Sequence, residues 1–138
     1  MADFTSFASN PLTPIMTTCI AIDDDPLFLK LLEVYFDEIF DAVLISSWEN
    51  PVKGALAIAK QNPDVVLLDY DMPYMDGFQM LDSLQTIPKI ILISGHIIEP
   101  NHDTNFDLFL PKSQLTSPDV LKRFVSEVIK TPDRTPDN

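Results

Sequence analysis

Short apolar segments alternate with longer amphipathic segments along most of the chain. The apolar segments have the length of β-strands and cover Cys19–Ile22, Val43–Ile45, Val65–Leu68, Ile90–Ile93 and Leu108–Leu110. The third of these is apolar at every position, which is typical of a central strand that helices cover on both faces. Strands that alternate with helices predict an α/β fold with a parallel sheet and right-handed crossovers.

Two helices are predicted in the first half of the chain from apolar residues at helical spacing. The first begins at Pro26, and its apolar face consists of Phe28, Leu31, Leu32, Tyr35, Phe36 and Ile39. The second follows Asn50, a favourable N-cap, and has Pro51 at its first position. Its buried stripe is predicted to consist of Val52, Ala55, Leu56 and Ala59.

Two further helices are predicted in the second half. One begins at Gly77 and ends before Pro88, with an apolar face of Phe78, Met80, Leu81 and Leu84. The last begins at Ser117-Pro118-Asp119, a strong helix start. Its apolar face consists of Leu121, Phe124, Val125 and Val128.

The helical pattern fails between Ser94 and Leu108. This segment contains Pro100, Asn101 and Asp103 and has no apolar stripe. The helix that should connect the fourth and fifth strands is therefore predicted to be short or missing. Residues 96–107 are predicted to be the most mobile internal segment.

The length of 138 residues suits one domain with one core. Residues 1–16 are polar, contain prolines and lack any period, so they are predicted to form a flexible N-terminal lead-in. Residues 17–130 hold the strand and helix pattern and form the predicted domain. Residues 131–138 are expected to be a C-terminal tail or the stub of a linker.

The chain is strongly acidic, with nine Lys and Arg residues against 21 Asp and Glu residues and a net charge of −12. We therefore expect no direct binding to nucleic acid or to an anionic membrane. No apolar run approaches the roughly 18 residues that a membrane span needs, and the first residues do not resemble a signal peptide. Cys19 is the single cysteine, so no internal disulfide can form, and the expected location is the cytoplasm.

Polar residues that can carry chemistry stand where the predicted strands end, and they are Asp23, Asp24, Asp69, Ser94 and Lys112. The carboxyl ends of parallel strands meet at one edge of a sheet, where such folds bind their ligands. Three carboxylates there would repel one another unless they were protonated or bridged by a cation, for which Mg²⁺ is the natural candidate. With a lysine and a hydroxyl opposite, this set suits phosphoryl transfer to a carboxylate.

The same residues resemble the receiver domain of two-component response regulators over residues 17 to about 130. The resemblance rests on Ile22-Asp23-Asp24-Asp25-Pro26, on the segment LLDYDMPYMDG at residues 67–77, on Ser94-Gly95, and on Lys112 with Phe109 three residues earlier. It implies a flavodoxin-like, doubly wound, five-stranded parallel sheet with strand order 2-1-3-4-5.

The resemblance also implies a role for each site residue. Asp69 would be the phosphoacceptor, and Lys112 and Ser94 would contact the phosphoryl group. Mg²⁺ would be bound by Asp24, by Asp69 and by the main-chain carbonyl of Asp71, and by Asp23 through a water. Ser94 and Phe109 would form the conformational switch, whereas Asp25 is expected to be only a solvated charge at a helix start.

The implied partner is a sensor histidine kinase or a histidine phosphotransfer protein, and a dimer that depends on phosphorylation is compatible with the family. The domain would catalyse only its own phosphorylation and dephosphorylation. Three features depart from the family: Ser113 stands where a cis-proline usually follows the lysine, the spacing from Ser94 to Lys112 is short, and Phe109 lacks the hydroxyl that often occurs there.

Two other functions compete with this interpretation. A receiver-like interaction module that is never phosphorylated is the stronger alternative, because the region of the fourth helix is eroded. A phosphatase of the haloacid dehalogenase type would share the D-x-D pattern of Asp69 and Asp71, but that family places it after the first strand. A calcium loop at the same place fails because Pro73 occupies a ligand position.

Overall fold

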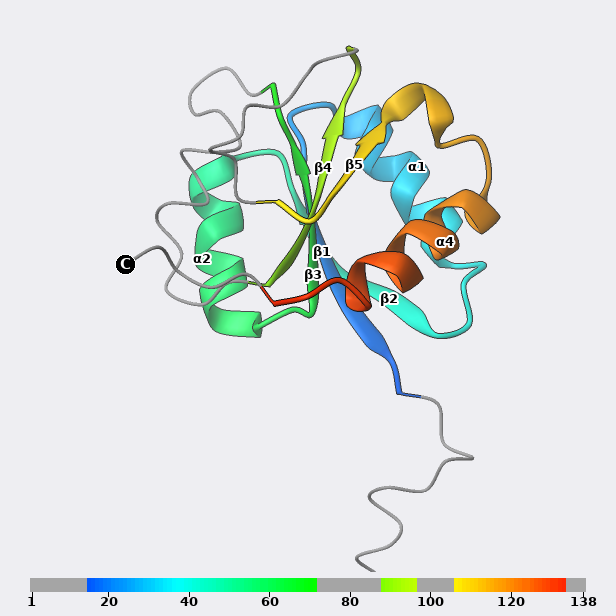
Figure 1. Cartoon of the computed structure of the whole chain (residues 1–138). Helices are drawn as coiled ribbons and strands as arrows, with labels where there is room; N and C mark the ends of the chain where they lie inside the picture. Colours follow the sequence, from blue (N-terminus) through cyan, green and yellow to red (C-terminus); the bar gives the residue numbers. More distant parts are fainter. Residues whose placement is uncertain (1–14, 72–87, 97–105, 134–138) are drawn as a thin grey trace, which may run out of the picture.

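The computed structural model describes residues 15–71, 88–96 and 106–133, and it contains a parallel sheet of five strands (Figure 1). The strands are β1 (Thr17–Ile22), β2 (Ala42–Trp48), β3 (Val65–Asp69), β4 (Lys89–Ser94) and β5 (Leu108–Pro111). Their order across the sheet is β2-β1-β3-β4-β5. The predicted fold and strand order are thereby confirmed.

Helices cover both faces of the sheet, as Figure 1 shows. The helices α1 (Pro26–Phe36) and α4 (Pro118–Ile129) lie on one face, and α2 (Pro51–Gln61) lies on the other. A short 3₁₀ helix, η2 (Lys112–Gln114), follows β5 directly. None of the helices in the described ranges has the length and apolarity needed to cross a bilayer.

Alternate residues of the strands point to opposite faces and build two apolar layers. Cys19 and Ala21 of β1 pack towards α1 and α4, whereas Ile20 and Ile22 pack towards α2. The strand β3 is buried along its whole length, as the sequence predicted for a central strand. The carboxyl ends of β1 and β3 therefore lie in the middle of the sheet edge, between helices.

The three α-helices in the described ranges each begin at a capping side chain followed by proline. Asn50 accepts hydrogen bonds from the N–H groups of Val52 and Lys53, and Ser117 Oγ accepts one from Val120. These caps satisfy N–H groups that have no partner within the helix. Asp25 Oδ1 accepts from Leu27 N–H at 3.0 Å, so this side chain is the N-cap of α1 and not merely a solvated charge.

The apolar faces of α1 and α4 agree with the prediction except at Ile39, which is buried in the same core but lies after the helix, since α1 ends at Phe36. Phe28, Leu32 and Phe36 are buried on α1, and Leu31 and Tyr35 pack against the same core. On α4 the buried residues are Leu121, Val125 and Val128. The sequence pattern missed Leu29, which is also buried on α1.

The predicted stripe of α2 is wrong except at Ala55, which is partly buried and packs against the core. Val52 and Leu56 are 57% and 58% exposed, and Ala59 is also exposed, whereas Pro51, Gly54, Ala57 and Ile58 are buried. Gly54 faces β1 at close range: a Cβ there would lie 2.5 Å from Cδ1 of Ile22, so a larger residue would require the Ile22 side chain to shift. The helix therefore buries a face that contains small residues, which allows it to lie close to the sheet, and leaves Val52 and Leu56 exposed.

Four expectations lie wholly or mainly outside the described residues. The helix predicted from Gly77 falls within residues 72–87, and the short or missing fourth helix falls within residues 97–105. The mobility predicted for residues 96–107 also falls mainly within residues 97–105. The predicted flexible lead-in falls mainly within residues 1–14.

Candidate functional site: an acidic cluster at the carboxyl ends of β1 and β3

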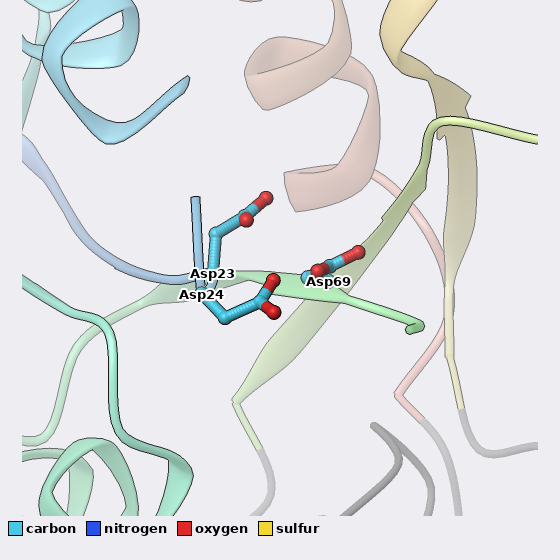
Figure 2. A group of neighbouring side chains, drawn as sticks. All are labelled: Asp23, Asp24 and Asp69. Atoms are coloured by element: carbon cyan, nitrogen blue, oxygen red, sulfur yellow. The ribbon is translucent and has the colours of Figure 1, made fainter. Parts of the chain in front are cut away.

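Three aspartates meet at the carboxyl ends of two neighbouring strands (Figure 2). Asp23 and Asp24 directly follow β1, and Asp69 is the last residue of β3. These strands pair in parallel with Ile22 opposite Leu68, so the residues that follow are brought side by side. One carboxylate oxygen from each aspartate lies within 4.8 Å of the others. We call Asp23, Asp24 and Asp69 the acidic cluster.

Asp23 is fully buried and is held by the backbone around it. Its N–H donates to the carbonyl of Trp48 at 3.0 Å, and its Oδ1 accepts from the N–H of Asp25 at 2.8 Å. Within the described part of the chain, its Oδ2 accepts no hydrogen bond of acceptable geometry. The ammonium of Lys112 lies 2.8 Å from that oxygen as an ion-pair partner.

Asp69 is 3% exposed and lies beside the fourth strand. The N–H of Tyr70 donates to the carbonyl of Ile93 at 2.8 Å, which continues the pairing with β4 past the end of β3. The N–H of Asp71 donates to Asp69 Oδ1 at 3.3 Å. The chain after β3 therefore turns back to orient the Asp69 carboxylate.

Burial and like charges shift the acid–base equilibria of the cluster. Burial, and next the negative charge of Asp23, raise the pKa of Asp69 to about 7. Burial also raises the pKa of Asp23, although the nearby Lys112 ammonium opposes this. Burial disfavours the charged form of Lys112, but its contact with Asp23 outweighs this and raises the pKa of Lys112.

The acidic cluster fits a small divalent cation. It offers three carboxylates that are close enough to share one ion, and two of them, Asp23 and Asp69, are buried. Burial, the largest cause, raises the pKa of both Asp23 and Asp69, and a cation bound at the cluster would favour their ionised forms. Mg²⁺ prefers oxygen ligands of this kind and retains several waters.

The remaining predicted site residues lie on β4 and β5. Ser94 is fully buried at the end of β4, where its Oγ accepts from the N–H of His96 at 3.0 Å and donates to Asp71 Oδ2 at 3.4 Å. Phe109 is half-buried on β5 and pairs with Leu92 of β4. Lys112 follows β5, and its side chain reaches back to Asp23.

One residue near the site was missed by the sequence reasoning. The ring centroid of Phe28 lies 4.5 Å from Nζ of Lys112. The pattern assigned Phe28 only to the buried face of α1, where it also belongs. One signal in the sequence indicated that Phe28 could reach the site: it lies in the first helical turn after Asp23 and Asp24.

The sequence from residue 19 to residue 110 matches a family model described as the response regulator receiver domain. The transcriptional regulatory protein BtsR of Escherichia coli K12 is 35% identical over 100 residues, which cover 69% of this chain and 42% of BtsR. FlgR of Helicobacter pylori is 39% identical over 75 residues, which cover 54% of this chain and 19% of FlgR. The chain thus spans less than half the length of these two relatives.

Two solved structures with the same fold are domains of response regulators. The signal receiver domain of the putative response regulator NarL from Mycobacterium tuberculosis is 26% identical, with a TM-score of 0.74. The alignment covers 85% of this chain and 98% of that domain. The response regulator domain of CheB from Thermotoga maritima, at 15% identity and a TM-score of 0.69, shares the fold over 88% of this chain and 99% of that domain.

Proposed function

The chain belongs to the response regulator receiver family, and from this membership we propose that Asp69 accepts a phosphoryl group in a Mg²⁺-dependent reaction. The proposal rests mainly on the acidic cluster, where a buried carboxylate at a strand end lies among two other carboxylates. The lysine that faces the cluster supports it, because its ammonium can contact phosphoryl oxygens.

The reaction requires the ionised form of Asp69. One of its carboxylate oxygens attacks phosphorus of a phosphohistidine whose other ring nitrogen is protonated; the P–N bond breaks, and the bonding electrons stay on nitrogen, so that a neutral imidazole leaves. The product is an acyl phosphate on Asp69. The metal-free protein has a pKa of about 7 at this carboxyl, so positive charge from Lys112 and from a bound cation increases the reactive anionic fraction.

Asp24, Asp69 and the main-chain carbonyl of Asp71 would bind Mg²⁺ directly, and Asp23 would bind it through a water. The bound ion would neutralise charge on the phosphoryl oxygens. Lys112 would transfer its contact from Asp23 to the phosphoryl group.

A switch would start at Ser94 in the same step. Its hydroxyl, which now donates to Asp71, would donate to the phosphoryl group instead. Phe109 on the adjacent strand would respond, and the change would be a shift between two populated states. A dimer that depends on phosphorylation would be one output of this shift.

The donor in the cell would be a sensor histidine kinase or a histidine phosphotransfer protein. The domain would catalyse only its own phosphorylation and dephosphorylation and would turn over no external substrate. The acidic surface disfavours contact with nucleic acid through this segment.

The test is incubation with acetyl phosphate, whose P–O bond would break with loss of acetate, followed by intact-mass measurement. We expect one phosphoryl group on the wild type with Mg²⁺ and none when the metal is chelated. Asp69→Asn should take no label, while Asp119→Asn, an exposed aspartate on α4, should be labelled like the wild type. A wild type that takes no label would support the interaction-module alternative, and continuous release of phosphate from varied phosphomonoesters would support a phosphatase.

A further inference from the structure

Among the described residues, the ammonium of Lys112 lies close to two different groups. It lies 2.8 Å from Oδ2 of Asp23 and 4.5 Å from the ring centroid of Phe28. A cation within about 6 Å of an aromatic centroid is attracted by the electron-rich ring face. The attraction is stronger where water is excluded, and here Phe28 is 7% exposed and the Lys112 side chain 23%.

Both partners are fixed by the local fold. Asp25 caps α1 and Pro26 begins it, so Leu27 faces solvent at 79% exposure and Phe28 faces the core. On the other side, the carbonyl of Lys112 accepts from the N–H of Leu115, whose side chain is buried. The backbone positions of the ring and of the lysine are therefore set before any ligand binds.

The two contacts respond differently to a metal ion. Asp23 attracts the ammonium in the metal-free protein, but the same carboxylate belongs to the acidic cluster that would bind Mg²⁺. A divalent cation at the cluster repels the ammonium and competes for the charge of Asp23. The ring of Phe28 has no net charge and is no metal ligand, so its attraction persists.

We propose that Phe28 is a positioning residue whose ring face retains the ammonium of Lys112 at the site when a cation takes over the charge of Asp23. The proposal rests on the proposed phosphorylation of Asp69 and adds a residue on α1 to it. Phe28 would act only through Lys112, so its loss should slow phosphoryl transfer without weakening metal binding.

Fluorine substitution of this one ring is the sharpest test, because fluorine removes electron density from the ring face and barely changes its shape. Mono-, di-, tri- and pentafluorophenylalanine would be placed at position 28 alone. We expect the rate constant with acetyl phosphate to fall stepwise, between about twofold and thirtyfold in total, from the usual range of cation–π energies. The Mg²⁺ dissociation constant, measured by calorimetry on unphosphorylated protein, should stay within about twofold because no ligand of the acidic cluster changes.

A second readout needs no activity. The side-chain methylene protons next to the ammonium of Lys112 should show an upfield ring-current shift in NMR spectra, and the shift should persist when Mg²⁺ is added. Phe28→Met keeps an apolar side chain of similar volume and should lose the shift, whereas Phe28→Tyr should keep it. Phe36→Met, at another buried aromatic residue of α1, is the matched control and should change neither the shift nor the rate.

Two results would overturn the proposal. The first is a phosphorylation rate that does not change on fluorination of Phe28, although Lys112→Met abolishes phosphorylation. The second is a ring-current shift that disappears when Mg²⁺ is added. Failure of the proposed function is distinguishable, because it appears as a wild type that takes no label at all. The NMR measurement would then decide by itself whether the ring holds the ammonium.

Discussion

Lys112 and Asp23 form an ion pair across the edge of the sheet, with 2.8 Å between Nζ and Oδ2. The carboxylate is fully buried, whereas the lysine side chain is 23% exposed. The lysine is therefore the main counter-charge of a carboxylate that water does not reach. This relationship makes the stability of the metal-free protein sensitive to Lys112.

Lys112→Met should lower the free energy of unfolding by about 3 kcal/mol without metal, because it leaves a buried carboxylate without its partner. Combining Lys112→Met with Asp23→Asn should recover part of this loss of stability. The coupling energy between the two substitutions should be about 1–3 kcal/mol in the double-variant cycle. Chemical denaturation of the four proteins measures this. Lys122→Met, at an exposed lysine of α4, is the control. Additive effects of the two substitutions would contradict the ion pair.

The pH dependence of stability should report on Asp69. Its carboxyl has a pKa of about 7 in the folded metal-free protein, against about 4 when unfolded. The folded state thus binds the proton more tightly, so this contribution is complete below about pH 4 and is lost as the pH rises through about 7. Relative to Asp69→Asn, the metal-free wild type should lose a few kcal/mol across this window.

Saturating Mg²⁺ should remove or reverse that difference, because the ion stabilises the ionised carboxylate. Urea denaturation at several pH values, with and without metal, checks both statements. Parallel pH profiles of wild type and Asp69→Asn in metal-free buffer would show that burial and Asp23 do not raise this pKa.

Mg²⁺ should stabilise the folded protein by RT ln(1 + [L]/Kd), which is about 1.4 kcal/mol at ten times Kd. Asp24→Asn should raise the melting temperature of the metal-free protein, because it relieves repulsion within the acidic cluster, and should blunt the response to Mg²⁺. Glu127→Gln, at an exposed carboxylate of α4, should do neither. A lower metal-free melting temperature of Asp24→Asn together with a full Mg²⁺ shift would mean that the three carboxylates share no site.

Gly54→Ala should destabilise the fold although alanine favours helices. The added Cβ would lie 2.5 Å and 2.8 Å from two side-chain atoms of Ile22. Overpacking of this kind costs about 1–3 kcal/mol, against a helix-propensity gain of about 1 kcal/mol. Ile22→Val removes the nearer atom and should relieve part of the clash. Gly95→Ala meets no atom within 4 Å and serves as the control in thermal melting.

The sequence by itself determined the order of the elements and the residues at their ends. Apolar runs such as Val65–Leu68 need burial on both faces, and N-caps such as Asn50 and Ser117 act through their own neighbours in the chain. The acidic residues after β1 and at the end of β3 could also be singled out from the sequence alone, because they directly follow apolar runs. Parallel strands bring such residues to one edge whatever the details of packing.

Tertiary structure decided what depends on distances between elements. Apolar content favoured Val52 and Leu56 as the buried face of α2, but the helix instead turns Gly54 to Ile22, where an added Cβ would force the Ile22 side chain to shift. The pairing of Lys112 with Asp23 likewise depends on how β5 and β1 approach each other. The position of the Phe28 ring beside the ammonium depends in the same way on the packing of α1. Periodicity along a chain carries no information on such distances, because side chains from separate elements meet only after the sheet and helices have packed.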